Sequence, residues 1–95
     1  MIKLNRAEPS IVIIDDHATT CRIVRDMLQQ MGIRRHVCEA SVDSALETLS
    51  KGLPELVIVD WYLGKITGRE VIQFVRRLDI ARGSVTRIIV MTALP

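Results

Sequence analysis

The sequence predicts an α/β fold, in which a parallel sheet carries helices on its faces. Short apolar runs alternate along the chain with stretches whose apolar residues recur at helical spacing, which gives the order β-α-β-α-β-α-β. Three of the runs are continuous and rich in β-branched residues, as expected of strands that are buried on both faces. A length of 95 residues with 48% hydrophobic content suits one globular domain near the small end of the range.

The first predicted strand and helix occupy residues 11–14 (IVII) and 18–31. Gly32 can end this helix. Its apolar residues recur at helical spacing, and we expect them, the methionines included, in the core: Ile23, Val24, Met27, Leu28 and Met31.

A weaker strand and a short helix follow. The strand candidate is HVCEA at residues 36–40, and the helix is SALETL at residues 44–49. Ser44 and Glu47 have the spacing of a capping box, which predicts that the helix starts there. The segment from Gly52 to Pro54 ends it.

The second half of the chain contains the other two strong strands. The first is the run LVIV at residues 56–59, and the other is RIIVM at residues 87–91. Between them, Thr67 and Glu70 have capping-box spacing and open a helix. The apolar face of that helix is Val71, Ile72, Phe74, Val75 and Leu78.

Composition argues against several classes of partner. The formal net charge is +2, with 13 basic and 11 acidic residues, so there is no electrostatic basis for nucleic acid or an anionic membrane as the main partner. No apolar run approaches the ~18 residues of a membrane span, and the N-terminus lacks a signal peptide's apolar core. We expect a cytoplasmic protein. Cys21 and Cys38 lack zinc spacing and are expected to be reduced core residues.

Polar side chains stand where three predicted strands end. Asp15 and Asp16 follow the first strong strand, Asp60 follows the second, and Thr92 follows the third. In parallel α/β sheets, functional groups gather beyond the carboxyl ends of the strands. Any one of these residues alone could be a helix cap or a turn residue. Their conjunction predicts a functional cleft.

Three carboxylates in one cleft would repel one another unless a cation joined them. A site made of oxygen ligands suits Mg²⁺, whereas histidine or thiolate ligands would favour zinc. His17 is the one nearby candidate for zinc, and we interpret it as a helix-start residue. A carboxylate beside Mg²⁺ can attack phosphorus to form an aspartyl phosphate, and a hydroxyl can bind a phosphoryl oxygen.

Three segments, IVIIDDH, LVIVDWYLGKITG and RIIVMTA, resemble the receiver domains of two-component response regulators. The match includes the acidic pair, the acceptor aspartate, a glycine eight residues later (Gly68) and the pair Thr92-Ala93. The resemblance implies a flavodoxin-like doubly wound parallel sheet of strand order 2-1-3-4. With right-handed crossovers, the first helix then lies alone on one face and the other two share the opposite face.

The resemblance also implies a role for each matching residue. Asp60 would be the phosphoacceptor for a sensor histidine kinase or a histidine phosphotransfer protein. Asp15, Asp16, Asp60 and the backbone carbonyl of Tyr62 would hold Mg²⁺. Thr92 would be the switch hydroxyl, and the Ala93 amide a further phosphate contact. Such a domain is a signalling module and not an enzyme acting on a separate substrate.

This sequence departs from the family pattern at two places. Gly64 stands where the family often has proline. The chain also ends three residues after Thr92, so the family's fifth strand, its phosphate-binding lysine and the flanking helices are missing, and neither Lys51 nor Lys65 matches that lysine. We therefore expect a single receiver domain over residues 1–95, C-terminally incomplete, that self-associates through its uncovered sheet.

Two alternatives to a phosphorylated receiver stay open. One is a receiver-like module that binds proteins without phosphorylation. The other, a metal-dependent phosphohydrolase, is weaker because the sequence offers neither a general acid for a leaving group nor a substrate pocket.

Overall fold

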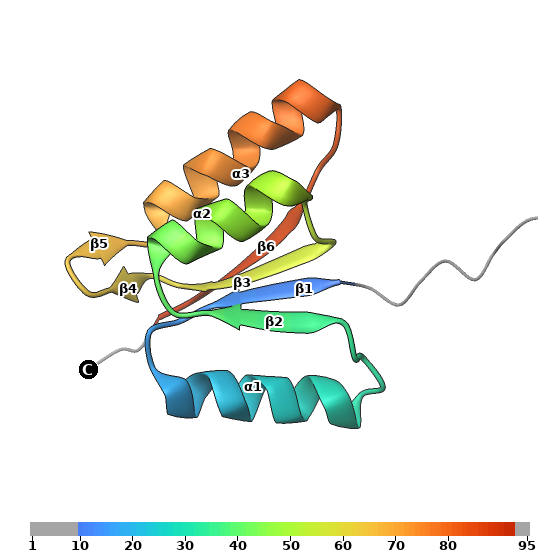
Figure 1. Cartoon of the computed structure of the whole chain (residues 1–95), viewed down its shortest axis with the longest axis vertical. Helices are drawn as coiled ribbons and strands as arrows, with labels where there is room; N and C mark the ends of the chain where they lie inside the picture. The colour runs from blue at the N-terminus through green and yellow to red at the C-terminus, as the bar shows by residue number, and fades with distance from the viewer. Residues whose placement is uncertain (1–9, 93–95) are drawn as a thin grey trace, which may run out of the picture.

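Four parallel strands form the central sheet, in the order β2-β1-β3-β6, and a two-stranded antiparallel ribbon projects from one end of it (Figure 1). The computed structural model describes residues 10–92. Its elements are β1 (Ile11–Ile14), α1 (Ala18–Gln30), β2 (His36–Glu39), α2 (Val42–Lys51), β3 (Leu56–Asp60), β4 (Tyr62–Leu63), β5 (Ile66–Thr67), α3 (Arg69–Arg82) and β6 (Arg87–Met91). The strand order is the one that the resemblance implies.

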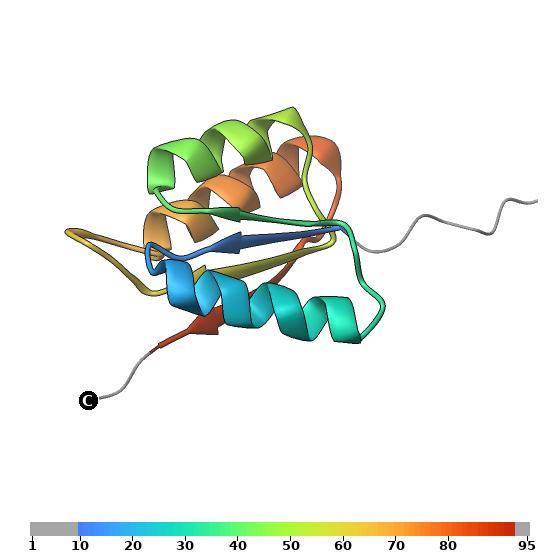
Figure 2. The same cartoon turned by 60° about the horizontal axis from the view of Figure 1, so that its bottom comes forward.

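The helices lie on the two faces of the sheet as the handedness argument predicts. α1 covers one face alone, and α2 and α3 lie together on the other (Figures 1 and 2). On the α2–α3 side the core is built around Val57 and Val59 of β3 with Val71 and Val75 of α3. On the α1 side, Ile13 and Ile58 pack with Leu28. None of the helices within residues 10–92 is long and apolar enough to span a membrane.

The expectation that α1 buries all of its apolar residues is wrong. Leu28 is buried and Val24 packs against the core, whereas the side chains of Ile23, Met27 and Met31 are 53%, 56% and 69% exposed. A single helix touches a sheet along a narrow stripe, and no second helix of the described chain shares this face. The remaining apolar side chains of α1 therefore face solvent.

Two helix starts also differ from the prediction. α2 begins at Val42 with Ser41 as its N-cap, and the Ser41 hydroxyl accepts a hydrogen bond from the Ser44 amide. The helix thus starts before the predicted capping box. α3 begins at Arg69 with Gly68 as its N-cap, although Thr67 Oγ1 still accepts a hydrogen bond from the Arg69 amide. The β4–β5 ribbon was not predicted, because strands of two residues are too short to show periodicity.

The two cysteines are joined in a disulfide, which corrects the expectation of reduced thiols. Cys38 pairs with Ile13 on β1, and α1 packs over β1 on the face to which Cys21 and Cys38 contribute. Their Cα atoms are 6.2 Å apart, within the usual range for a disulfide. Spacing along the sequence carries no signal of this contact, because the fold creates it.

A buried carboxylate anchors the connection between α3 and β6. Asp79 is 5% exposed and accepts hydrogen bonds from the Thr86 amide and hydroxyl, the Ser84 hydroxyl and Arg76. Burial raises the pKa of Asp79, but these hydrogen bonds outweigh burial and lower the pKa from 3.8 to about 2. The network fixes the start of β6, the edge strand that leads to Thr92.

We expect Asp79→Asn to destabilise the domain by about 1–3 kcal/mol, because donors aimed at the carboxylate lose charge-assisted bonds. The folded-state pKa lies below the unfolded value, so the contribution of Asp79 is present above about pH 4 and is lost as pH falls from about 4 to about 2. Urea unfolding at several pH values measures this difference. The exposed Asp26→Asn is the control. A natural chain and an Asp79→Asn chain with the same acid transition would contradict the analysis.

The edge strand β6 exposes two β-branched residues. Ile89 and Val90 are 51% and 41% exposed on opposite faces of the strand, and the outer edge of β6 pairs with no other described strand. An apolar unpaired edge is a template for pairing with another chain. We expect the chain to self-associate as its concentration rises, and Ile89→Lys to reduce that association. Light scattering over a concentration series tests this, with Ile80→Lys on α3 as the control. A monomer at every concentration would exclude the edge contact.

Candidate functional site

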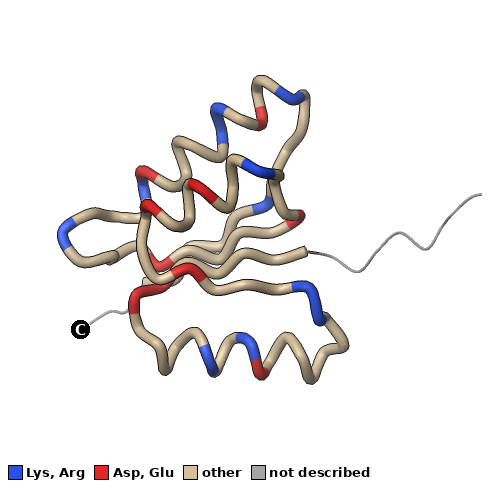
Figure 3. Tube along the Cα trace, viewed as in Figure 1, with Lys and Arg blue, Asp and Glu red and all other residues tan. Residues whose placement is uncertain are grey.

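The sheet brings Asp15 and Asp60 to the same rim. Ile14 of β1 pairs with Val59 of β3, so Asp15, which follows β1, and Asp60, the last residue of β3, lie at neighbouring carboxyl ends. Both aspartates are buried, at 3% and 8% exposed, while the side chain of Asp16 is 36% exposed. Acidic residues gather at this end of the sheet (Figure 3). The strand-end argument therefore places these three carboxylates correctly.

His17 stands between the first two carboxylates. Its amide donates a hydrogen bond of 2.8 Å to Asp15 Oδ1. Its ring Nδ1 lies 3.1 Å from Asp15 Oδ1 and 3.0 Å from Asp16 Oδ1. The hydrogen bond to Asp15 and the charge of Asp16 raise the pKa of His17 above 6.5. His17 is the N-cap of α1, as the helix-start interpretation requires, and its ring also partners the acidic pair.

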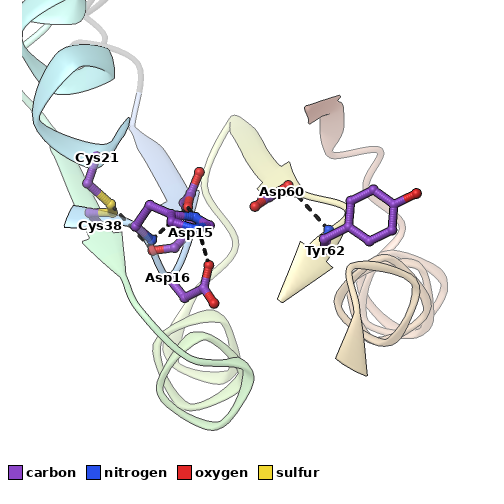
Figure 4. A network of polar contacts seen from close by, with 7 residues as sticks. Asp15, Asp16, Cys21, Cys38, Asp60 and Tyr62 are labelled. Carbon is purple, nitrogen blue, oxygen red and sulfur yellow. Dashed lines mark hydrogen bonds and ion pairs between the residues drawn. A yellow bond between two sulfur atoms is a disulfide. The ribbon is translucent and has the colours of Figure 1, made fainter. Parts of the chain in front are cut away.

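Asp60 approaches the pair from β3. Its Oδ1 accepts a hydrogen bond of 3.2 Å from the Tyr62 amide, while the Tyr62 ring points away and is exposed (Figure 4). One ligand atom from each of Asp15, Asp16, His17 and Asp60 lies within 4.8 Å of the others. Carboxylates so close together, two of them buried, are the donor set that a hard divalent cation stabilises. The residues present therefore fit Mg²⁺.

An open cleft of about 340 Å³ lies over the site and is lined by Asp15, His17, Thr20, Asp60, Met91 and Thr92. Thr92 directly follows β6 and is exposed. The structure thus brings the threonine to the aspartates, as predicted, whereas Ala93 lies outside the described residues. Thr20, in the first turn of α1, was not singled out from the sequence, because its only signal is its position on the helix that follows the acidic pair.

Gly68 lets the start of α3 lie against the end of β3. A Cβ atom there would lie 2.8 Å from the backbone oxygen of Asp60 and 3.0 Å from Cγ2 of Val59. The Gly68 amide donates a hydrogen bond of 2.7 Å to the Trp61 carbonyl. Glycine is therefore required at position 68 because a side chain would clash with β3, and not because the backbone angle is unusual.

The model of the response regulator receiver domain family matches residues 11–94 of the sequence. The chain belongs to this family. Its match covers both aspartate-bearing strand ends and Thr92, so the site described above lies inside the family's domain. Receiver domains are signalling modules of two-component systems, and the family match therefore places this domain in that class.

Solved structures show the same fold. A mutant of the response regulator MaeR bound to sulfate has 21% sequence identity and a TM-score of 0.78, with 94% of this chain and 70% of that chain covered. The PhyR receiver domain of Erythrobacter litoralis has 22% identity and a TM-score of 0.71, with 92% and 64% covered.

A third match comes from the Saccharomyces cerevisiae co-crystal of the phosphotransfer protein Ypd1 with the receiver domain of Ssk1. It has 18% identity and a TM-score of 0.71, with 92% of this chain and 65% of that chain covered. Another matching chain, a fusion with a yeast trimeric coiled coil, is covered to 57% of its length. The chain therefore spans roughly three fifths to two thirds of most of these structures.

We expect His17→Ala to strengthen Mg²⁺ binding severalfold at neutral pH, because the ring occupies oxygens of Asp15 and Asp16 that the ion would use. Trp61, the only tryptophan, adjoins Asp60, so its emission during a Mg²⁺ titration reports the site. His36→Ala is the matched control, since His36 lies on β2 and bonds to Arg25. Weaker binding by His17→Ala would instead make the ring a metal ligand.

Proposed function

We propose that the chain accepts a phosphoryl group on Asp60 from the phosphohistidine of a sensor histidine kinase or a histidine phosphotransfer protein, and that phosphorylation switches what the domain binds. The position of Asp60 is the observation that carries this proposal. Asp60 is 8% exposed, lines an open cleft and lies at the rim shared with Asp15 and Asp16.

The carboxylate of Asp60 has one oxygen oriented and one available. Oδ1 accepts the Tyr62 amide, and no hydrogen bond from a described residue to Oδ2 is present. In the reaction, Oδ2 attacks phosphorus, the phosphorus–nitrogen bond to the donor histidine breaks, and the histidine nitrogen keeps the electron pair and takes a proton. The product is an aspartyl phosphate. An ionised carboxylate needs no base to activate it.

Asp15, Asp16, Asp60 and the backbone carbonyl of Tyr62 would hold Mg²⁺, which when bound offsets charge on the phosphoryl oxygens. Thr92, which lines the same cleft, would donate its hydroxyl to a phosphoryl oxygen. The Ala93 amide, beyond the described residues, is proposed as a further contact. His17 and Asp15 hold each other in place before the phosphoryl group arrives.

Support for the partner comes from the matching yeast co-crystal, in which the receiver domain of Ssk1 is bound to a histidine phosphotransfer protein. The chain and such a donor would meet in one compartment, which we propose is the cytoplasm. The balanced charge of the chain supports a protein partner over nucleic acid or membrane.

A second candidate is a module that binds proteins without being phosphorylated. The exposed side chains of Ile23, Met27 and Met31 favour it, because they recur every four residues along α1 and its C-cap and form one apolar stripe. Such a stripe can dock a partner whatever the state of Asp60.

Treatment with a small acyl phosphate and Mg²⁺ distinguishes the two candidates. We expect the mass of the intact natural chain to rise by one phosphoryl group. Asp60→Asn should abolish this phosphorylation, and Asp16→Asn should slow it. Asp43→Asn, an exposed carboxylate at the start of α2, is the control and should be phosphorylated like the natural chain. A natural chain that stays unmodified while it binds Mg²⁺ would favour the second candidate.

A further inference from the structure

The disulfide lies beside the acidic site. It joins Cys21 of α1 to Cys38 of β2, and both residues are partly exposed (Figure 4). Cys21 and Cys38 line a groove of about 550 Å³ that also includes Asp15 and Asp16. Both cysteines, partly exposed, therefore line the same open groove as the residues that carry two of the carboxylates.

Backbone contacts connect each cysteine to Asp15. The Cys21 amide donates to the His17 carbonyl at 3.1 Å, and the His17 amide in turn holds the Asp15 carboxylate. On the other side, Cys38 precedes Glu39, whose carbonyl accepts a hydrogen bond of 3.1 Å from the Asp15 amide. Cys21 Sγ itself lies 3.6 Å from the Asp15 carbonyl oxygen. The disulfide thus ties together the two segments between which Asp15 is held.

Few other contacts hold α1 in place. Leu28 is its one buried side chain, and Leu28 lies near the end of the helix far from the acidic pair. At the end near the site, the N-cap His17 makes no side-chain capping bond. The cross-link therefore adds a covalent restraint at the end of α1 next to Asp15 and Asp16, where no side chain of the helix is buried.

We propose that Cys21 and Cys38 form a reversible redox pair that tunes the acidic site, with the disulfide form holding Asp15 and Asp16 ready for a divalent cation and the dithiol form binding it more weakly. The tuning rests on the proposed function, whereas the redox pair itself does not. Disulfides in a reducing compartment are mostly transient and redox-sensing, which matches a pair that is accessible from solvent.

The reaction is thiol–disulfide exchange. A thiolate of a dithiol reductant attacks one sulfur, the Cys21–Cys38 bond breaks, and a mixed disulfide forms. The second thiol of the reductant then displaces the remaining sulfur. Cys21 and Cys38 have gained two electrons and two protons, and the reductant has become a cyclic disulfide. A disulfide oxidant of the same class reverses the sequence.

Coupling of this kind is reciprocal. If the disulfide form binds Mg²⁺ about fivefold more tightly, saturating Mg²⁺ must favour the disulfide by the same factor. For a two-electron couple, fivefold corresponds to a shift of about 20 mV in the midpoint potential.

Two measurements on the full chain test the proposal. In the first, the chain is oxidised with a disulfide oxidant and divided into two samples, one of which is then reduced with a dithiol. Both samples are treated with a thiol-alkylating reagent, and mass spectrometry counts the alkyl groups added to each. We expect no alkyl groups before reduction and two after it. Two alkyl groups before reduction would overturn the redox pair, without bearing on phosphorylation of Asp60.

In the second, Trp61 emission follows a Mg²⁺ titration of the oxidised and the reduced chain. We expect about fivefold weaker binding after reduction. The double variant Cys21→Ser/Cys38→Ser, checked for folding by circular dichroism, should bind Mg²⁺ with the affinity of the reduced chain. The reductant should not change that affinity. Equal affinity in the two states of the natural chain would overturn the tuning alone. No Mg²⁺ response in either state, from folded protein, would overturn the metal site of the proposed function and the tuning with it.

Discussion

Hydrogen bonding of β1 along both of its edges is the constraint on which the rest of the structure depends. Each residue from Ile11 to Ile14 has a parallel partner on β2 and another on β3. Ile13 and Ile14 are fully buried on opposite faces, so β1 belongs to both cores. The crossover from β1 to β2 steps one way along the sheet, and those from β2 to β3 and from β3 to β6 step the other way. Because all three are right-handed, α1 lies on one face and α2 and α3 on the other. The same pairing leaves the carboxyl ends of β1 and β3 side by side.

Bringing these strand ends together also brings their negative charges together. The hydrogen bonds around the site partly offset that charge. Asp15 is held by the amide and ring of His17, and Asp60 by the amide of Tyr62. These contacts orient the carboxylates without neutralising all of their charge, which leaves the rim attractive to a cation. Asp79, buried near the other end of α3, is different: four donors satisfy its carboxylate, and it serves the fold.

The parts of this structure that sequence predicts well are those with a local signal. The strands at 11–14, 56–60 and 87–91 each contain a continuous apolar run, and the aspartates are placed by where the runs at 11–14 and 56–59 end. The failures depend on contacts between distant segments. Whether Met27 is buried depends on how many helices share its face, and whether Cys21 meets Cys38 depends on how α1 lies over β1 and β2. No periodic pattern in the sequence indicates either contact.

The two glycines of the segment between β3 and α3 set different rules for redesigning it. Gly64, at the turn of the ribbon, has φ +70° and no atom within 4 Å of a Cβ placed there, so its limit is backbone conformation and asparagine is the natural substitute. Gly68 has φ −63°, which every residue adopts, yet a Cβ there meets the backbone of Asp60. An engineer can vary the exposed turn of the ribbon at Gly64 and Lys65, but must keep glycine at position 68 to leave the end of β3 where it is.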